Sequence, residues 1–160
     1  YSFNDYEKGI YYNVAPISGG RPNGVVAGEA RGEFCVAGIP ENADFPVIQA
    51  RLDSMADQVT VEGCRVQVTY RTLFPAMERN AANHSAYLRA AEAAELLCWE
   101  PEEIADPAAT DGAYLSTYGV PTVDALSAIA EQIHTTEERV RIPSIRDRTA
   151  LCAAMLGLLG

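Results

Sequence analysis

The sequence predicts a mixed fold of the α+β and α/β classes, arranged in two parts. Residues 10–75 show the order strand, strand, helix, strand, which is typical of a small βαβ-type two-layer domain. After a break at residues 74–83, the rest of the chain is dominated by helical patterns with short apolar segments between them. The 160 residues, 48% of them hydrophobic, suffice for one core or for two small units.

Three strands are predicted in the first part. Residues 10–17 (IYYNVAPI) and 30–39 (ARGEFCVAGI) are rich in β-forming residues, and a turn cluster of glycines and a proline separates them. Residues 64–72 (CRVQVTYRT) alternate apolar and polar side chains, which predicts a strand with one buried face. The apolar positions of that alternation are Val66, Val68 and Tyr70.

A helix is predicted over residues 40–59, between the second and third strands. Apolar residues recur there at steps of three and four, as expected for an amphipathic helix. They are Phe45, Ile48, Leu52, Met55 and Val59. Asn42 or Asp44 is expected to cap its start, since short polar side chains accept hydrogen bonds from the first helical amides.

The second part is predicted to contain two long helices. One covers residues 85–99, which are rich in Ala, Leu and Glu, and the other covers residues 144–159, with Ser144 as its cap. Apolar positions of the last helix are Ile145, Leu151, Met155 and Leu158. Between the long helices we expect a short helix that ends at Gly119 and a short buried strand over residues 120–126.

The charge of the chain excludes two classes of partner. The formal net charge is −10 and Lys8 is the single lysine, so the chain lacks the basic patches that bind nucleic acid or anionic membranes. No apolar run approaches the ~20 residues of a membrane span. The four cysteines have no zinc-knuckle or redox spacing, which predicts reduced, mostly buried thiols in a cytoplasmic protein. The opening residues, without Met or a leader pattern, suggest a cut into a longer protein.

Three motifs occur in a fixed order: GGRPNGVVAGEA at 19–30, TDGAYLSTYGVPTVDAL at 110–126 and HTTEERV at 134–140. Together they resemble the dinuclear-zinc amidohydrolase and carboxypeptidase family, which includes glutamate carboxypeptidase, acetylornithine deacetylase and succinyl-diaminopimelate desuccinylase. In that family a small lid, or dimerisation, domain interrupts a zinc catalytic domain. The resemblance implies that residues 1–80 are an N-terminally truncated lid and residues 81–160 the C-terminal part of the catalytic domain.

The resemblance implies a metal-binding role for His134, which matches the last zinc ligand of the family. A neutral imidazole is a good zinc ligand, but one histidine cannot hold the ion alone. The two zinc ions of a complete enzyme would need ligands from a part of the family's sequence that nothing here matches. The alternative is a histidine packed in the core or exposed in a loop. Glu138, four residues later, would orient the loop or the ligand, or be a solvated surface charge.

Further positions are matched to the family's substrate-binding and structural residues. Asn23 matches a lid asparagine that can donate a hydrogen bond to substrate; the alternative is that it adopts a left-handed turn conformation. Thr110 is expected to face the substrate, and Asp111 to cap the short helix that follows. Gly19 and Gly20 are expected to serve the turn.

One position departs from the family's substrate-binding pattern. Ala37 stands where the family usually has an arginine that binds the substrate carboxylate, and alanine cannot do so. The resemblance implies part of a zinc-dependent hydrolase that cleaves an amide or peptide bond of an N-acyl amino acid or small peptide with metal-activated water. It also implies a homodimer formed through the lid, and inactivity of this fragment alone. The alternatives are a dimerisation module and a catalytically silent relative.

Overall fold

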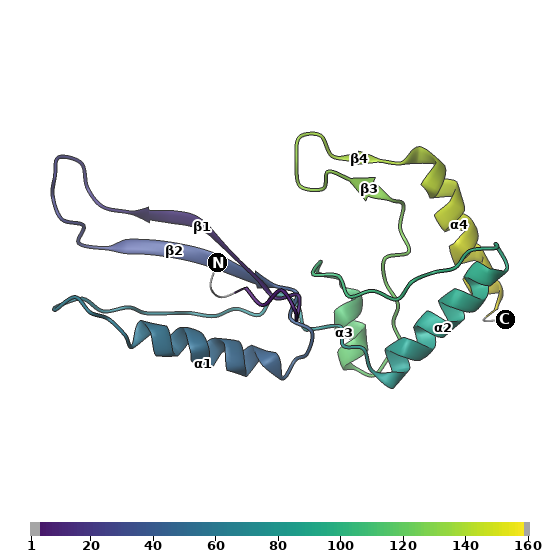
Figure 1. The fold of residues 1–160 in the computed structure, drawn as a ribbon, viewed down its shortest axis with the longest axis horizontal. Coiled ribbons are helices and arrows are strands. Elements are labelled where there is room, and N and C mark those ends of the chain that lie inside the picture. The colour runs from purple at the N-terminus through teal and green to yellow at the C-terminus, as the bar shows by residue number, and fades with distance from the viewer. Residues whose placement is uncertain (1–3, 159–160) are drawn as a thin grey trace. The chain divides into compact units, whose positions relative to one another are not determined.

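The computed structural model describes residues 4–158 and divides them into two compact units (Figure 1). The first unit contains the described residues up to Ala76 together with Ala105–Ala109. The second contains Met77–Ile104 and the described residues from Thr110 onward. Both units mix helices with an antiparallel pair of strands, so the mixed α and β class is confirmed. The parallel pairing typical of α/β folds does not occur between residues 4 and 158.

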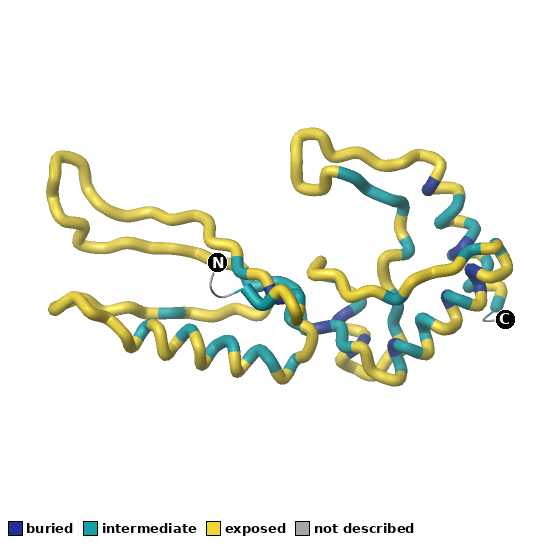
Figure 2. Tube along the Cα trace, viewed as in Figure 1, coloured by how far each residue is buried: buried dark blue, intermediate teal, exposed yellow. Residues whose placement is uncertain are grey.

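The first unit is built from a long hairpin and one helix. Strand β1 (Tyr11–Gly19) pairs antiparallel with β2 (Ala30–Ala37), and the register shifts between Val14 and Ile17. The predicted first two strands are therefore confirmed. Helix α1 (Asp44–Ala56) follows, within the predicted range. Figure 2 shows that most of the hairpin is exposed.

Two predictions for the first unit are wrong. Residues 64–72 form no strand, because no neighbouring strand pairs with them in the described part of the chain. The expected cap of α1 is also absent: Ala43 is the N-cap residue, and no side chain bonds there. The Asn42 side chain instead donates to the carbonyl of Ala76 (3.1 Å) and accepts from its amide (2.9 Å). These two bonds hold Ala76 beside the start of α1.

The second unit has its core between two long helices, α2 (Ala81–Glu95) and α4 (Ile142–Gly157). Ala93, Ala94 and Leu151 form the buried centre, because small side chains on α2 allow a close approach. Half-buried apolar residues surround this centre: Leu97, Trp99, Leu126, Ala154, Met155 and Leu158. Three of the four predicted apolar positions of α4 thus pack in the core, whereas Ile145 is exposed.

The remaining elements of the second unit are short. Helix α3 (Gly112–Thr117) is confirmed, and Gly119 adopts the positive φ that ends such a turn. Strands β3 (Ala130–Glu131) and β4 (Arg139–Val140) form a hairpin that sequence reasoning missed. The strand predicted over 120–126 is wrong, since that segment is irregular and only partly buried.

Both long helices of this unit begin before the predicted residue. Helix α2 begins four residues early, because the side chain of Asn80 accepts a hydrogen bond from the Asn83 amide (2.9 Å). Ser144 does not cap α4; it is buried, donates to the Arg141 carbonyl and accepts from the Ile129 amide.

The cysteines are also placed differently from the expectation. Three of them are exposed and Cys152 is half-buried, so the prediction of mostly buried thiols is wrong; all four are free. Cys35 is exposed because it lies in the uncovered hairpin. Among the described residues, no helix is long and apolar enough to cross a membrane.

Candidate functional site

The candidate site is the loop that joins β3 to β4 and presents His134. The hairpin is closed by the Arg141 amide, which donates to the Ile129 carbonyl at 2.9 Å. On its surface, Glu131 accepts hydrogen bonds from Arg139 (2.9 Å) and Arg141 (3.1 Å). The hydrogen bonds from Arg141 and Arg139 hold the pKa of the Glu131 carboxyl below its usual range. The charged pairs thus fix a hairpin whose strands have two residues each.

Within the loop, the backbone turns sharply at His134. His134 has φ +66°, a left-handed conformation that is uncommon outside glycine, and its side chain is exposed. The Glu138 carboxylate accepts a hydrogen bond from the His134 amide at 3.2 Å. Thr135 bonds back to the Gln132 carbonyl through both its amide and its hydroxyl. Glu138 therefore orients the backbone of the loop, whereas the imidazole projects from it.

A complete metal site is not assembled by the described residues. Nowhere between residues 4 and 158 do three His, Cys, Asp or Glu side chains gather as a ligand set. His134 contributes a single imidazole, so the residues present do not fit a zinc ion by themselves.

At the start of α3, Thr110 and not Asp111 accepts a hydrogen bond from a backbone amide through its side chain. The Thr110 hydroxyl accepts from the Gly112 amide (3.1 Å), whereas the Asp111 side chain makes no capping hydrogen bond. The capping role expected for Asp111 is therefore wrong. Close packing favours glycine at position 112, since a Cβ atom there would lie 3.0 Å from the methyl group of Thr122. Thr110 is half-buried and Asp111 exposed.

The matched residues of the first unit lie at the tip of the hairpin and at its base. Asn23 is exposed with φ +71°, a left-handed turn conformation that asparagine adopts more readily than most residues. Gly19 ends β1 opposite Ala30, whose Cα would lie 2.7 Å from an added Cβ. Gly20 has φ +83° and no close neighbour, so it serves the turn. Ala37 ends β2 opposite Tyr11.

Sequence reasoning missed two polar clusters in the second unit. Buried Asn83 on α2 donates to the Glu78 carbonyl and to the Ser116 hydroxyl (both 2.7 Å), and accepts from the Thr122 amide (3.0 Å). The sequence pattern placed Asn83 in the break before the predicted helix, so it gave no signal for this cluster.

The second cluster surrounds the other histidine of the chain. His84 Nδ1 lies 3.2 Å from Glu103 Oε2 and 3.0 Å from Arg79 Nη2. Partial desolvation acts to raise the pKa of Glu103, but the hydrogen bonds from Arg79 and His84 outweigh it and the pKa is lowered. His84 is thereby held by charged neighbours, in contrast to the projecting His134.

The fold matches part of a solved peptidase structure. The chain superposes on the crystal structure of aminopeptidase PepT from Bacillus cereus with a TM-score of 0.68 and 21% sequence identity. The match covers 91% of this chain and 39% of the aminopeptidase chain. The resemblance drawn from the three motifs is thus confirmed at the level of the fold. No family model matches the sequence, and neither does any curated protein.

Proposed function

We propose that this chain is the later part of a zinc-dependent hydrolase that cleaves an amide or peptide bond, in a small peptide or an N-acyl amino acid. The observation that supports this most is the structural match to an aminopeptidase over nearly the whole chain. The sequence motifs supply an independent argument, because they lie in the order of a zinc-hydrolase family.

Within this proposal His134 supplies one metal ligand. Its backbone is held by Glu138 and the loop turns, while its imidazole is exposed and free to meet ligands from elsewhere in the complete enzyme. Such preorganisation lowers the cost of placing a ligand. Zinc in such a site lowers the pKa of bound water and polarises a carbonyl. This chain's own residues hold the ligand loop; Thr110, beside α3, is proposed to face the substrate.

The test uses the complete natural protein that contains this sequence, purified without chelators. We expect His134→Ala to lower bound zinc by about one ion per chain and to abolish hydrolysis of dipeptides and N-acyl amino acids. His84→Ala is the matched control, since His84 is engaged by Glu103 and Arg79. Unchanged zinc content in His134→Ala refutes the ligand role. Wild-type protein without zinc refutes the hydrolase proposal and favours a silent relative.

A second candidate function, self-association of the first unit, is favoured by the exposed hairpin. Strand β1 pairs on one side only among the described strands, and Val14 and Ile17 are 58% and 75% exposed. An edge with apolar residues is a template for pairing with a second copy. A homodimer formed there would break up with Ile17→Lys, but not with the control Val26→Lys in the hairpin loop. A wild-type protein that stays monomeric at high concentration in sedimentation refutes it.

A further inference from the structure

The turn between β1 and β2 contains an asparagine that is followed directly by a glycine. Of the asparagines in the sequence, only Asn23 precedes a glycine, Gly24. Asparagine is one of the chemically labile residues of proteins. A glycine after it has no Cβ atom to hinder an approach to its backbone nitrogen. At this step of the chain, therefore, the side-chain amide carbon and the next backbone nitrogen can approach each other with least hindrance.

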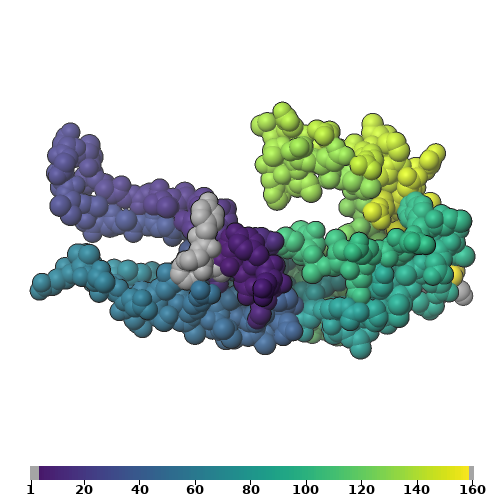
Figure 3. Space-filling model, viewed as in Figure 1, coloured from purple at the N-terminus to yellow at the C-terminus, as the bar shows by residue number. Residues whose placement is uncertain are grey.

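The hairpin tip, residues 20–29, leaves both of these groups accessible. Every residue of the tip is exposed, and Val26 is 90% exposed. No described residue accepts a hydrogen bond from the Gly24 amide or binds the Asn23 side chain. A Cβ atom built on Gly24 would meet nothing within 4 Å. On the face shown in Figure 3, no other part of the first unit covers the tip.

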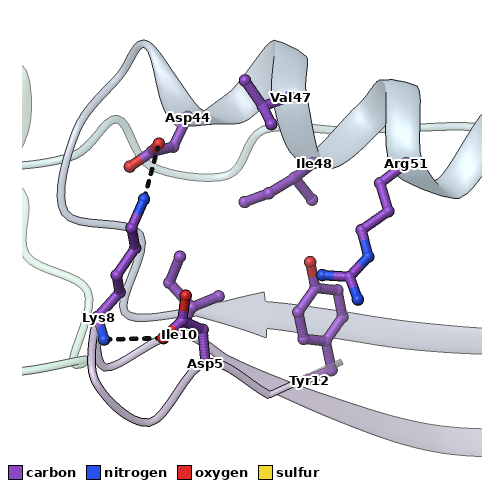
Figure 4. A pocket seen from close by; sticks show the side chains of 8 residues that line it. All are labelled: Asp5, Lys8, Ile10, Tyr12, Asp44, Val47, Ile48 and Arg51. Carbon is purple, nitrogen blue, oxygen red and sulfur yellow. Dashed lines mark hydrogen bonds and ion pairs between the residues drawn. The ribbon is translucent and has the colours of Figure 1, made fainter. Parts of the chain in front are cut away.

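The hairpin is held to α1 at its opposite end. Lys8 Nζ lies 3.9 Å from Asp44 Oδ1 on α1, and Asp5 accepts a hydrogen bond from the Lys8 amide at 3.0 Å (Figure 4). Ile10, just before β1, and Ile48 of α1 line the small cavity between these elements. The tip has no comparable contacts with α1 in the described structure, so its backbone can move while the base of the hairpin stays in place.

Two comparable steps in the second unit are restrained by the fold. Asp111–Gly112 is the single Asp-Gly step of the sequence, but the Gly112 amide donates to the Thr110 hydroxyl at 3.1 Å and Gly112 begins α3. The Asn83 side chain is buried and makes three hydrogen bonds. Neither restraint, on the backbone nitrogen or on the side chain, operates at Asn23.

We propose that Asn23–Gly24 is a site of spontaneous deamidation. The Gly24 backbone nitrogen attacks Cγ of Asn23 and closes a succinimide ring. The Cγ–Nδ2 bond breaks, and Nδ2 leaves as ammonia with the proton that the Gly24 amide gives up. Water then adds to either ring carbonyl, the bond from that carbon to the Gly24 nitrogen breaks, and the nitrogen regains a proton. Opening at Cγ gives aspartate, and opening at the backbone carbonyl carbon gives isoaspartate.

The reaction changes what the hairpin tip presents to solvent. The amide group of Asn23 donates and accepts hydrogen bonds, whereas the carboxylate of either product only accepts them. The product also adds one negative charge to a chain whose formal net charge is −10. Because the conversion needs only water and time, the isoaspartate content at this position records the age of the molecule. The inference does not depend on zinc or on hydrolysis, so it stands or fails separately from the proposed function.

Peptide mapping by mass spectrometry tests the inference on the complete natural protein that contains this sequence, incubated at neutral pH and physiological temperature. Trypsin releases residues 9–31 as one peptide, because a proline follows Arg21, and this peptide contains both Asn23 and Asn13. We expect Asn23 to gain about 1 Da at a rate at least about tenfold that of Asn13, since the β-branched Val14 hinders attack there. Isoaspartate should be among the products. Conversion at Asn23 no faster than at Asn13, or to aspartate without isoaspartate, overturns the inference.

A pair of substitutions tests whether the Gly24 nitrogen is the attacking group. Gly24→Ala places a methyl group beside this nitrogen and should slow the conversion of Asn23 by about tenfold. Gly28→Ala is the matched control, because it lies in the same tip and its added Cβ would also meet nothing within 4 Å. The rate in Gly28→Ala should equal that of the wild type. Equal rates in Gly24→Ala and the wild type overturn the inference.

Discussion

Replacing Asn83 is expected to destabilise the second unit strongly. Its side chain makes three hydrogen bonds: to the Glu78 carbonyl, to the Ser116 hydroxyl and from the Thr122 amide. Asn83 is 7% exposed, so water cannot readily replace these bonds. At about 1 kcal/mol net for each bond, Asn83→Ala should lower the free energy of unfolding by about 3 kcal/mol.

The bonds of Asn83 join segments that are distant in sequence. Ser116 belongs to α3, and Thr122 to the irregular segment after it. Loss of the Asn83 side chain should therefore weaken the attachment of α3 and of this segment to α2. At a pH where the new carboxyl group is ionised, Asn83→Asp should lower the free energy of unfolding at least as much as Asn83→Ala. It keeps the acceptor for Thr122 but directs a carboxylate oxygen at the Glu78 carbonyl.

Urea denaturation followed by Trp99 fluorescence is the assay, because this single tryptophan packs against the α2–α4 core. With a slope near 2 kcal/mol per molar urea, 3 kcal/mol moves the midpoint by about 1.5 M. Glu92→Ala, on the exposed face of the same helix, is the control and should shift it little. A loss below about 1 kcal/mol for Asn83→Ala would refute the argument that these bonds hold the unit together.

Three further predictions concern the second unit. Gly112→Ala should cost about 1–3 kcal/mol in urea denaturation, because its Cβ would crowd a threonine methyl at 3.0 Å, whereas Gly157→Ala, which meets no neighbour, should not destabilise. Thr110→Val should lower the free energy of unfolding by about 0.5–2 kcal/mol, because it removes the acceptor of the Gly112 amide, whereas Asp111→Ala should leave it unchanged. The reverse order would contradict the role given to the Thr110 hydroxyl. The hydrogen bonds from Arg141 and Arg139 lower the pKa of Glu131 on folding. The contribution of ionised Glu131 to the stability of the fold is therefore present above its unfolded pKa of about 4.3 and is lost as the pH falls through the folded pKa. Glu131→Gln should therefore lose less stability than wild type between pH 7 and pH 3, and equal losses would contradict the role of its arginine partners.

The sequence determined those features that depend on neighbouring residues. Apolar spacing placed α1 and the core side of α4, where Leu151 and Met155 pack as predicted. β-forming runs around a glycine-rich turn placed the β1–β2 hairpin. The order of the three motifs indicated a fold that the structural comparison then matched. The helix and strand signals each lie within a short window of the chain, and the physical preference that produces them acts within the same window.

The tertiary structure alone decided the hydrogen-bond partners of polar side chains. Ser144 has the residue type of a cap, but it binds the amide of Ile129, fifteen positions away. Asn42 likewise binds Ala76 instead of the helix that follows it. Residues 64–72 show the opposite case: the pattern of a strand is present, but no described neighbour pairs with it. A strand or a cap exists only when a complementary donor or acceptor arrives from elsewhere in the chain, and spacing along the sequence does not determine which one arrives.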